Sequence, residues 1–111
     1  MMGLLDLLGF GKKSKEVMVE ALKDGAVIVD VRSPAEFQGG HVAGAHNYPL
    51  DRIGSQLEGL KAAGKPVVFC CASGMRSGRA TSQAKSAGIT AYNGGGWMSL
   101  NGIVQELKES H

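Results

Sequence analysis

The chain has 111 residues, 17 of them Gly, and its 12 Lys and Arg against 10 Asp and Glu give a formal net charge of +2. This length suits one domain, because two would leave neither with enough residues for a core. With only 3 Pro and 43% hydrophobic residues, the composition excludes a collagen-like or disordered chain, and the modest charge argues against nucleic-acid partners. The only two Cys are adjacent, so a disulfide framework is excluded and we expect a reducing, cytoplasmic compartment.

Residues 1–14 form an apolar and basic segment that precedes the predicted domain of residues 15–111. No apolar run reaches the ~20 residues of a transmembrane helix, so no transmembrane segment is expected. Asp6 interrupts the apolar stretch, no positive residue precedes it and no small-residue cleavage site follows, which argues against a signal peptide. We interpret the segment as a terminal helix that covers the domain's own core or frays, with docking on a partner or membrane surface as the alternative.

The predicted elements follow one pattern, in which a helix ends at a Gly and an apolar strand follows within a few residues. Gly25, Gly64 and Gly88 each stand just past a helix, where the left-handed backbone favours Gly. The apolar runs behind them do not alternate with polar residues, which is typical of strands buried on both faces. In chain order we expect a helix over 14–23, a strand at 27–29, a short helix over 33–38, a strand at 45–48, a helix within 55–63, a strand at 67–69, a helix over 74–87, a strand at 89–92 and a helix over 98–108. The sequence therefore predicts an α/β fold with a mainly parallel central sheet flanked by helices on both faces.

Chemically active residues gather where the predicted strands end. Asp30 and Arg32 follow one strand, the segment from Cys70 to Arg76 follows another, and Gly94–Gly96 follow a third. Because ligands bind outside the carboxyl ends of the strands in open parallel sheets, we expect the functional site at this edge.

The segment that begins at Cys71 carries the clearest chemical signal. A buried strand runs into the small residues Ala72, Ser73 and Gly74, and a helix starts immediately behind them. Successive backbone N–H groups in such a turn form an anion-binding nest, reinforced by the positive end of the helix. Together with the Arg76 guanidinium, these groups would stabilise a thiolate. Cys71 is therefore predicted to titrate below the free value of about 8.5 and to be a nucleophile near neutral pH.

Two motifs resemble the rhodanese family of sulfurtransferases. Residues 71–77, Cys-Ala-Ser-Gly-Met-Arg-Ser, match that family's Cys-x-x-Gly-x-Arg-Ser loop between a strand and a helix. Residues 29–49 match its signature Asp-Val-Arg…Glu-Phe…Gly-His-Ile-x-Gly-Ala…Asn-Ile-Pro. The resemblance covers residues 15–108 and implies a rhodanese-like single domain.

The resemblance also implies a reaction. Family members carry sulfane sulfur as a persulfide on the loop Cys, which is Cys71 here, and need no other cofactor. The thiolate attacks the outer sulfur of a small anionic donor such as thiosulfate, sulfite leaves, and cyanide or a thiol then accepts the sulfur. Arg76 would orient the donor as the second catalytic residue. The substrate-binding loop would comprise Ala72, Ser73, Gly74, Met75 and Ser77.

Three other interpretations stay open. A sulfur-relay module would use the same Cys71 to pass sulfur to a partner protein. A phosphatase or arsenate reductase is disfavoured, because the spacing from Cys71 to Arg76 is one residue shorter than the Cys-x-x-x-x-x-Arg loop of the related dual-specificity phosphatases. A non-enzymatic binding domain is disfavoured because such versions usually lose the loop Cys. Ala72 and Met75 depart from the polar residues of many members, so we expect modest affinity for thiosulfate and consider a bulkier organic persulfide as donor.

Asp30, Arg32, Glu36 and His41 are predicted to support the loop from behind. We expect Asp30 to hold the loop by hydrogen bonds and Arg32 to pair with Glu36, with a purely structural Asp30–Arg32 ion pair as the alternative. His41 is interpreted as a loop anchor rather than a general base.

Cys70 is interpreted as a small core residue, because side chains alternate along a strand and it points away from Cys71. A strained disulfide between the two is the alternative. No metal is expected, because the spacing of the His and Cys residues fits no usual ligand pattern. Gly94–Gly96 and Trp97 either line the pocket or form the turn into the last helix, and Arg79 is expected to be exposed.

Overall fold

The computed structural model describes residues 14–109, which contain one sheet of four parallel strands in the order β2-β1-β3-β4. The elements in chain order are α2 (Ser14–Lys23), β1 (Val27–Asp30), α3 (Pro34–Gln38), β2 (His46–Asn47), the 3-10 helix η1 (Leu50–Gln56), α4 (Leu57–Ala63), β3 (Val67–Cys71), α5 (Met75–Ser86), β4 (Ala91–Gly96) and α6 (Trp97–Glu109). The predicted α/β fold is confirmed. Apart from Ser14, the predicted terminal segment lies outside the described residues, so its docking stays a prediction.

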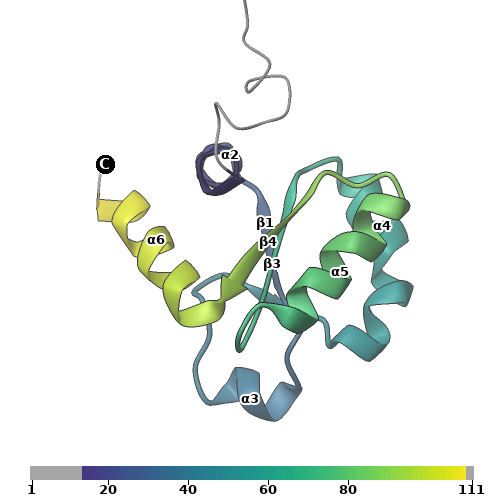
Figure 1. Ribbon diagram of the computed structural model, residues 1–111, viewed down its shortest axis with the longest axis horizontal. Helices are drawn as coiled ribbons and strands as arrows, with labels where there is room; N and C mark the ends of the chain where they lie inside the picture. Colours follow the sequence, from purple (N-terminus) through teal and green to yellow (C-terminus); the bar gives the residue numbers. More distant parts are fainter. Residues whose placement is uncertain (1–13, 110–111) are drawn as a thin grey trace, which may run out of the picture.

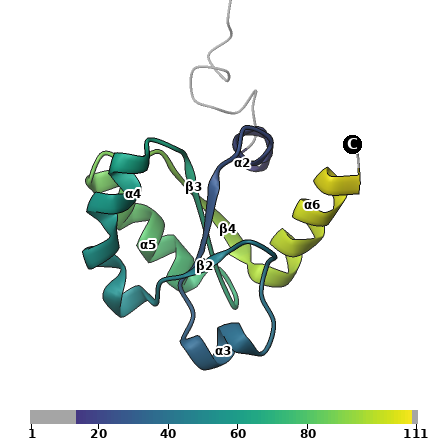
Figure 2. The same ribbon diagram turned by 180° about the vertical axis from the view of Figure 1, so that it is seen from behind.

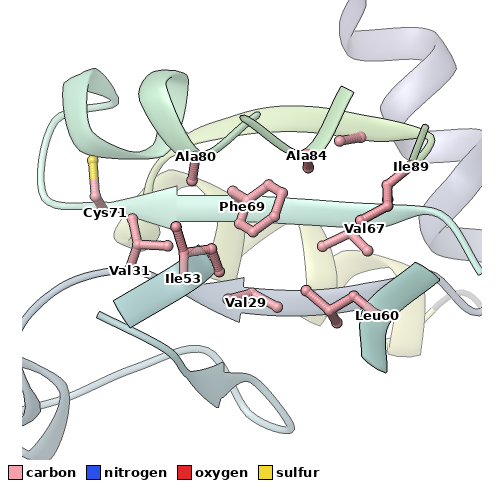
Figure 3. Packing of buried hydrophobic residues seen from close by; sticks show 11 residues of the cluster. Val29, Val31, Ile53, Leu60, Val67, Phe69, Cys71, Ala80, Ala84 and Ile89 are labelled. Carbon is pink, nitrogen blue, oxygen red and sulfur yellow. The ribbon is translucent and has the colours of Figure 1, made fainter. Parts of the chain in front are cut away.

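Helices cover both faces of the sheet, as predicted (Figures 1 and 2). On one face, α4 and α5 enclose a cluster in which Phe69 of β3 packs with Leu60 and Ala80 (Figure 3). On the other face, Val68 of the same strand packs with Leu100 of α6, and α2 completes that layer. The short helix α3 lies apart from both layers, beyond the carboxyl ends of the strands (Figure 1).

The strand register brings three carboxyl ends level with one another. β3 lies between β1 and β4, and all five of its residues are buried. Asp30 at the end of β1 is the partner of Cys70, and Gly96 at the end of β4 is the partner of Cys71. The candidate residues therefore share one edge of the sheet, which is where ligands bind in folds of this kind.

The last strand differs from the predicted one. It runs over Ala91–Gly96 instead of 89–92, and α6 begins directly behind it at Trp97. The interpretation of the three Gly residues as a turn is therefore wrong. A Cβ atom at Gly94 would lie 2.9 Å from the Val68 Cγ1 atom and 3.0 Å from the Phe69 carbonyl oxygen. Only Gly lets the strand continue so close to β3.

The ends of two helices follow from single residues. A capping box starts α3, because the Glu36 N–H donates to the Ser33 hydroxyl at 3.3 Å and the Ser33 N–H donates to the Glu36 carboxylate at 3.1 Å. Gly64 adopts the left-handed conformation, with a φ of +71°, and ends α4 as predicted. The capping box also fixes the place of the Glu36 carboxylate, which matters for the site described next.

Candidate active site

Cys71 is the last residue of β3, and its side chain is fully buried on the face that α5 covers. The Gly74 backbone N–H donates to the Cys71 Sγ atom at 3.0 Å, and the Ser77 N–H donates at 3.4 Å. The Ser77 hydroxyl lies 3.3 Å from the same sulfur. Gly74 turns the chain into α5 with a φ of +103°, a conformation that residues with side chains rarely adopt. The chain thus curls round one sulfur atom, and this sulfur is buried inside the loop.

The surroundings of Cys71 favour its thiolate. Burial raises the pKa of the thiol, but hydrogen bonds from the Ser77 hydroxyl and from the N–H groups of Ser77, Gly74 and Ser73 outweigh it, so the pKa lies below its ordinary value. The N-terminal end of α5 adds positive potential on the same side. These groups therefore favour the thiolate of Cys71, which is the nucleophilic form of a cysteine side chain.

Cys70 has the opposite environment. Its side chain is fully buried in the second core cluster, with Val68 and Leu100. Burial, with a smaller contribution from the Asp30 charge, raises the pKa of the Cys70 thiol to about 12. Both cysteines are free and belong to different core clusters, on opposite faces of the sheet. This placement agrees with the interpretation of Cys70 as a core residue.

Asn93 of β4 ties the loop together from the side. The Ser77 hydroxyl donates to the Asn93 Oδ1 atom at 2.7 Å, and the Gly95 N–H donates to the same oxygen at 2.9 Å. The Asn93 Nδ2 atom donates to the Gly74 carbonyl at 3.0 Å. Because the single Ser77 proton goes to Asn93, a neutral Cys71 thiol is the donor in its contact with Ser77. One side chain thus holds the loop at Gly74 and at Ser77.

The glycines of β4 form the wall behind the loop. A Cβ atom at Gly96 would lie 3.0 Å from the Ala72 carbonyl oxygen, and one at Gly74 would lie 3.4 Å from the Gly95 Cα atom. Bare backbone on both sides therefore lets the loop and the strand approach closely. Of the two interpretations of this Gly run, the turn does not form, and its role as a pocket wall stays a prediction.

Arg76 points to the rim of the site, where it pairs with Glu36 of α3. Its Nη1 and Nη2 atoms donate to the two carboxylate oxygens of Glu36 at 2.8 and 3.0 Å. Arg76, followed by Ser33, lowers the pKa of Glu36 to about 2. The prediction that Glu36 pairs with Arg32 is therefore wrong. Arg32 reaches only the Glu36 backbone carbonyl, at 3.2 Å, because its guanidinium is engaged elsewhere.

Arg32 forms a buried ion pair with Asp30. The Asp30 carboxylate is fully buried and accepts from the Arg32 Nη2 atom at 2.7 Å and from Nε at 3.0 Å. The guanidinium also stacks on the Trp97 ring, 4.8 Å from its centroid, and donates to the Gly40 carbonyl at 2.7 Å. The Asp30 side chain makes no hydrogen bond to the Cys71 loop, so the prediction that it holds the loop is wrong and the structural ion pair is what forms.

The remaining candidate residues lie further out. His41 stacks on Phe37, and its Nδ1 atom lies 2.8 Å from the Phe37 carbonyl oxygen, as a loop anchor would. Met75 is 75% exposed at the front of the loop, and Arg79 is exposed. Residues 14–109 hold no group of three or more His, Cys, Asp or Glu side chains that could bind a metal ion. Within the same range, no helix is both long and apolar enough to cross a membrane.

Comparison with known proteins identifies this arrangement. Residues 14–100 match the family model of the rhodanese-like domain, which is most of the chain. The chain belongs to the rhodanese-like domain family. Its loop, from Cys71 to Ser77, stands at the same point between strand and helix that the sequence motif predicts.

Relatives of this rhodanese-like domain occur in several bacteria. The protein YqhL of Bacillus subtilis is 38% identical over 75% of this chain and 67% of its own length, and a Synechocystis protein is 46% identical over 60% and 37%. The chain therefore spans little more than a third of the second relative. Among solved structures, the rhodanese from E. coli with anions is 31% identical, with a TM-score of 0.60 over 67% of this chain and 89% of that one. A rhodanese-like domain protein from Staphylococcus aureus is 27% identical, with a TM-score of 0.61 over 79% and 86%.

Sequence reasoning missed one residue of the rhodanese-like site. Asn93 stands directly before the Gly run, and the only local signal is a polar side chain within a strand of small and apolar residues. The contacts that reveal its place join residues 16 and 19 positions apart, so they depend on the register of β4 against β3.

Proposed function

We propose that this rhodanese-like domain is a sulfurtransferase that carries sulfane sulfur as a persulfide on Cys71. The observation that carries the proposal is the pair of backbone donors to the Cys71 Sγ atom, the Gly74 N–H at 3.0 Å and the Ser77 N–H at 3.4 Å. The Ser77 hydroxyl lies 3.3 Å from the same sulfur and can turn toward it when the thiol ionises. Preorganised donors of this kind stabilise a negative charge wherever it resides on the sulfur chain, so the same groups serve the thiolate and the persulfide anion.

In the first half of the reaction, the Cys71 thiolate attacks the outer sulfur of thiosulfate. A bond forms between the Sγ atom and that sulfur, the S–S bond of the donor breaks, and sulfite leaves with the electron pair. The total charge is conserved, because a thiolate and a dianion give a persulfide anion and a sulfite dianion. The charge on the terminal sulfur then lies within reach of the N-terminal end of α5.

In the second half, cyanide or a thiolate attacks the terminal sulfur and regenerates the Cys71 thiolate. The thiolate is a good leaving group here because the hydrogen bonds that lower its pKa also lower its energy as it departs. No further cofactor takes part in this proposal, since the sulfur carried on Cys71 is itself the transferred group.

Arg76 supplies a positive charge at the rim for the anionic donor. Glu36 occupies two of its guanidinium N–H groups, and a guanidinium has further N–H donors that a sulfonate oxygen can accept. The E. coli rhodanese, 31% identical and solved with anions, supports an anionic donor for this chain. Because Arg76 already pairs with Glu36, we expect it to bind a dianion with moderate affinity.

Mass spectrometry of the intact protein after incubation with thiosulfate tests the proposal. The wild type is expected to gain the mass of one sulfur atom and to lose it on addition of cyanide. Cys71→Ser is expected to gain nothing, whereas Cys70→Ser serves as the matched control and is expected to gain sulfur as the wild type does. Equal gain on both cysteines, gain on neither, or efficient hydrolysis of an aryl phosphate without persulfide would contradict the proposal.

A further inference from the structure

A groove of about 430 Å³ opens beside the Cys71 loop, between the start of α3 and the start of η1. Its apolar lining comes from Val31, Pro34, Pro49 and Leu50. Val31 lies directly beside Cys71 in the core cluster, and Figure 3 shows the two side chains together at this end of the sheet. The groove thus lies on the face toward which Cys71 points.

Arg76 connects the groove to the site of sulfur chemistry. It lines the groove and is also part of the chain that curls round the Cys71 sulfur. A molecule that fills the groove can therefore place one end at the rim of the loop. The Cys71 side chain is fully buried, so that end must be narrow, and a terminal sulfur atom meets this requirement.

The charged groups of the groove favour an anion on the body of the ligand. Arg76 already pairs with Glu36, whereas Arg52 is exposed, lines the groove and forms no ion pair within the described part of the chain. Asp51 also lines the groove, and its carboxylate lies beyond ion-pair distance of Arg52. Within residues 14–109, Arg52 is thus a cation without an ion-pair partner next to an apolar surface.

The size of the groove decides which class of molecule fits. A volume of about 430 Å³ falls within the range of about 300–1,000 Å³ that is typical of sites for small organic molecules. Thiosulfate has no apolar part and is far too small to fill such a space. An organic group would cover Pro34, Pro49 and Leu50, which otherwise stay partly in contact with water.

We propose that this groove binds the organic part of a persulfide donor or thiol acceptor whose apolar body carries a carboxylate, with Arg52 as the partner of that carboxylate. The inference rests on the proposed function. As donor, the ligand is R–S–S–H. The Cys71 thiolate attacks its terminal sulfur and a bond forms between the two sulfur atoms. The S–S bond of the donor breaks, R–S⁻ leaves with the electron pair, and Cys71 becomes Cys71–S–S–H with no net oxidation. The reverse reaction uses the same groove for the thiol as acceptor.

Discharge of the persulfide to two matched thiols tests the inference. The full chain is loaded with thiosulfate, and kcat/KM is measured for 4-(mercaptomethyl)benzoate and for benzyl mercaptan, which differ only in the carboxylate. The wild type is expected to prefer the carboxylated thiol. Arg52→Gln is expected to lower the ratio of the two kcat/KM values about fivefold, which corresponds to ~1 kcal/mol for an exposed ion pair.

Further variants separate the groove from general effects. Arg52→Lys keeps the charge and is expected to keep most of the ratio. Leu50→Asn is expected to lower kcat/KM for both benzylic thiols relative to that for 2-mercaptoethanol. Lys65→Gln removes a positive charge at the opposite edge of the sheet and is expected to keep the wild-type ratio. An equal ratio in the wild type and Arg52→Gln, with normal persulfide loading, would overturn the groove proposal alone. Failure of the wild type to load sulfur would instead overturn the proposed function.

Discussion

The Ser77 hydroxyl offers the sharpest test of how the loop lowers the pKa of Cys71. In the neutral state this hydroxyl donates to Asn93, at 2.7 Å. When Cys71 ionises, the hydroxyl can turn toward the sulfur, 3.3 Å away, because the Gly95 N–H still donates to the Asn93 oxygen. Ser77→Ala removes this donor and is expected to raise the pKa of the Cys71 thiol.

The size of the effect follows from the kind of hydrogen bond that is lost. A hydrogen bond to a charged group contributes about 1.5–3 kcal/mol, and each ~1.4 kcal/mol changes an ionisation equilibrium tenfold. At a pH below both pKa values, the thiolate fraction should therefore fall by about ten- to a hundredfold. Folding should change little, because Ala favours a helix more than Ser by about 0.5 kcal/mol and the Asn93 oxygen keeps its Gly95 donor.

The assay is the pH titration of the thiolate by ultraviolet absorbance, followed by the pH profile of iodoacetamide alkylation mapped to Cys71. Both midpoints are expected to move upward in Ser77→Ala. Ser82→Ala is the matched control, since Ser82 lies exposed on the same helix and makes none of these contacts. Coincident titration curves for Ser77→Ala and the wild type would refute the argument that the hydroxyl stabilises the thiolate.

Three further predictions concern the fold around the site. Asp30→Asn breaks the buried ion pair with Arg32 and is expected to lower the free energy of unfolding by about 3 kcal/mol in urea titrations, because the Arg32 charge stays buried. Cys70→Ala is expected to reduce the loss of stability at alkaline pH. An unfolded Cys ionises near pH 8.5, whereas the folded Cys70 ionises only near 12. Between these pH values the Cys70 thiol therefore lowers the free energy of unfolding of the wild type by about 1.4 kcal/mol per pH unit, and the variant lacks this loss. Gly96→Ala is expected to displace the Ala72 carbonyl, 3.0 Å from the new Cβ atom, and to slow persulfide formation more than it lowers the melting temperature.

Each of these predictions has a control variant or an outcome that would contradict it. Glu36→Gln breaks the exposed ion pair instead of the buried one and should affect unfolding much less than Asp30→Asn. For Cys70→Ala, an alkaline slope equal to that of the wild type would contradict the assignment of that slope to the buried thiol. For Gly96→Ala the control is Gly59→Ala, which has open space round the new Cβ atom within helix α4 and should be neutral or stabilising.

Much of the fold follows from local signals in the sequence. The Gly residues after helices and the capping box at Ser33 depend on a few neighbouring residues and lie in the structure where the pattern predicts, as do the apolar runs of β1 and β3. The last strand does not, because it begins later and continues through the Gly run. The loop from Cys71 to Ser77 is equally local, because its donors lie within six residues of the sulfur.

The ion pairs could not be assigned in the same way. Glu36 and Arg76 are 40 residues apart, and their pairing depends on how α3 folds back beneath the end of β3. From the sequence alone, Arg32 is the nearer cation to Glu36. It pairs instead with Asp30, two residues away, and its guanidinium lies over the ring of Trp97, which is 65 residues further along the chain.

The opposite orientation of the two cysteines has a consequence for oxidative damage. A sulfenic acid on a reactive Cys is usually rescued when a neighbouring thiol condenses with it to a disulfide. Cys70 is the only other Cys in the chain, and it is buried on the far face of the sheet. Within this chain, a sulfenic acid at Cys71 therefore has no thiol partner for its rescue, which depends on a thiol from elsewhere. Without one, oxidation would proceed to the irreversible sulfinic acid, and Cys71 could no longer act as the nucleophile of the proposed reaction.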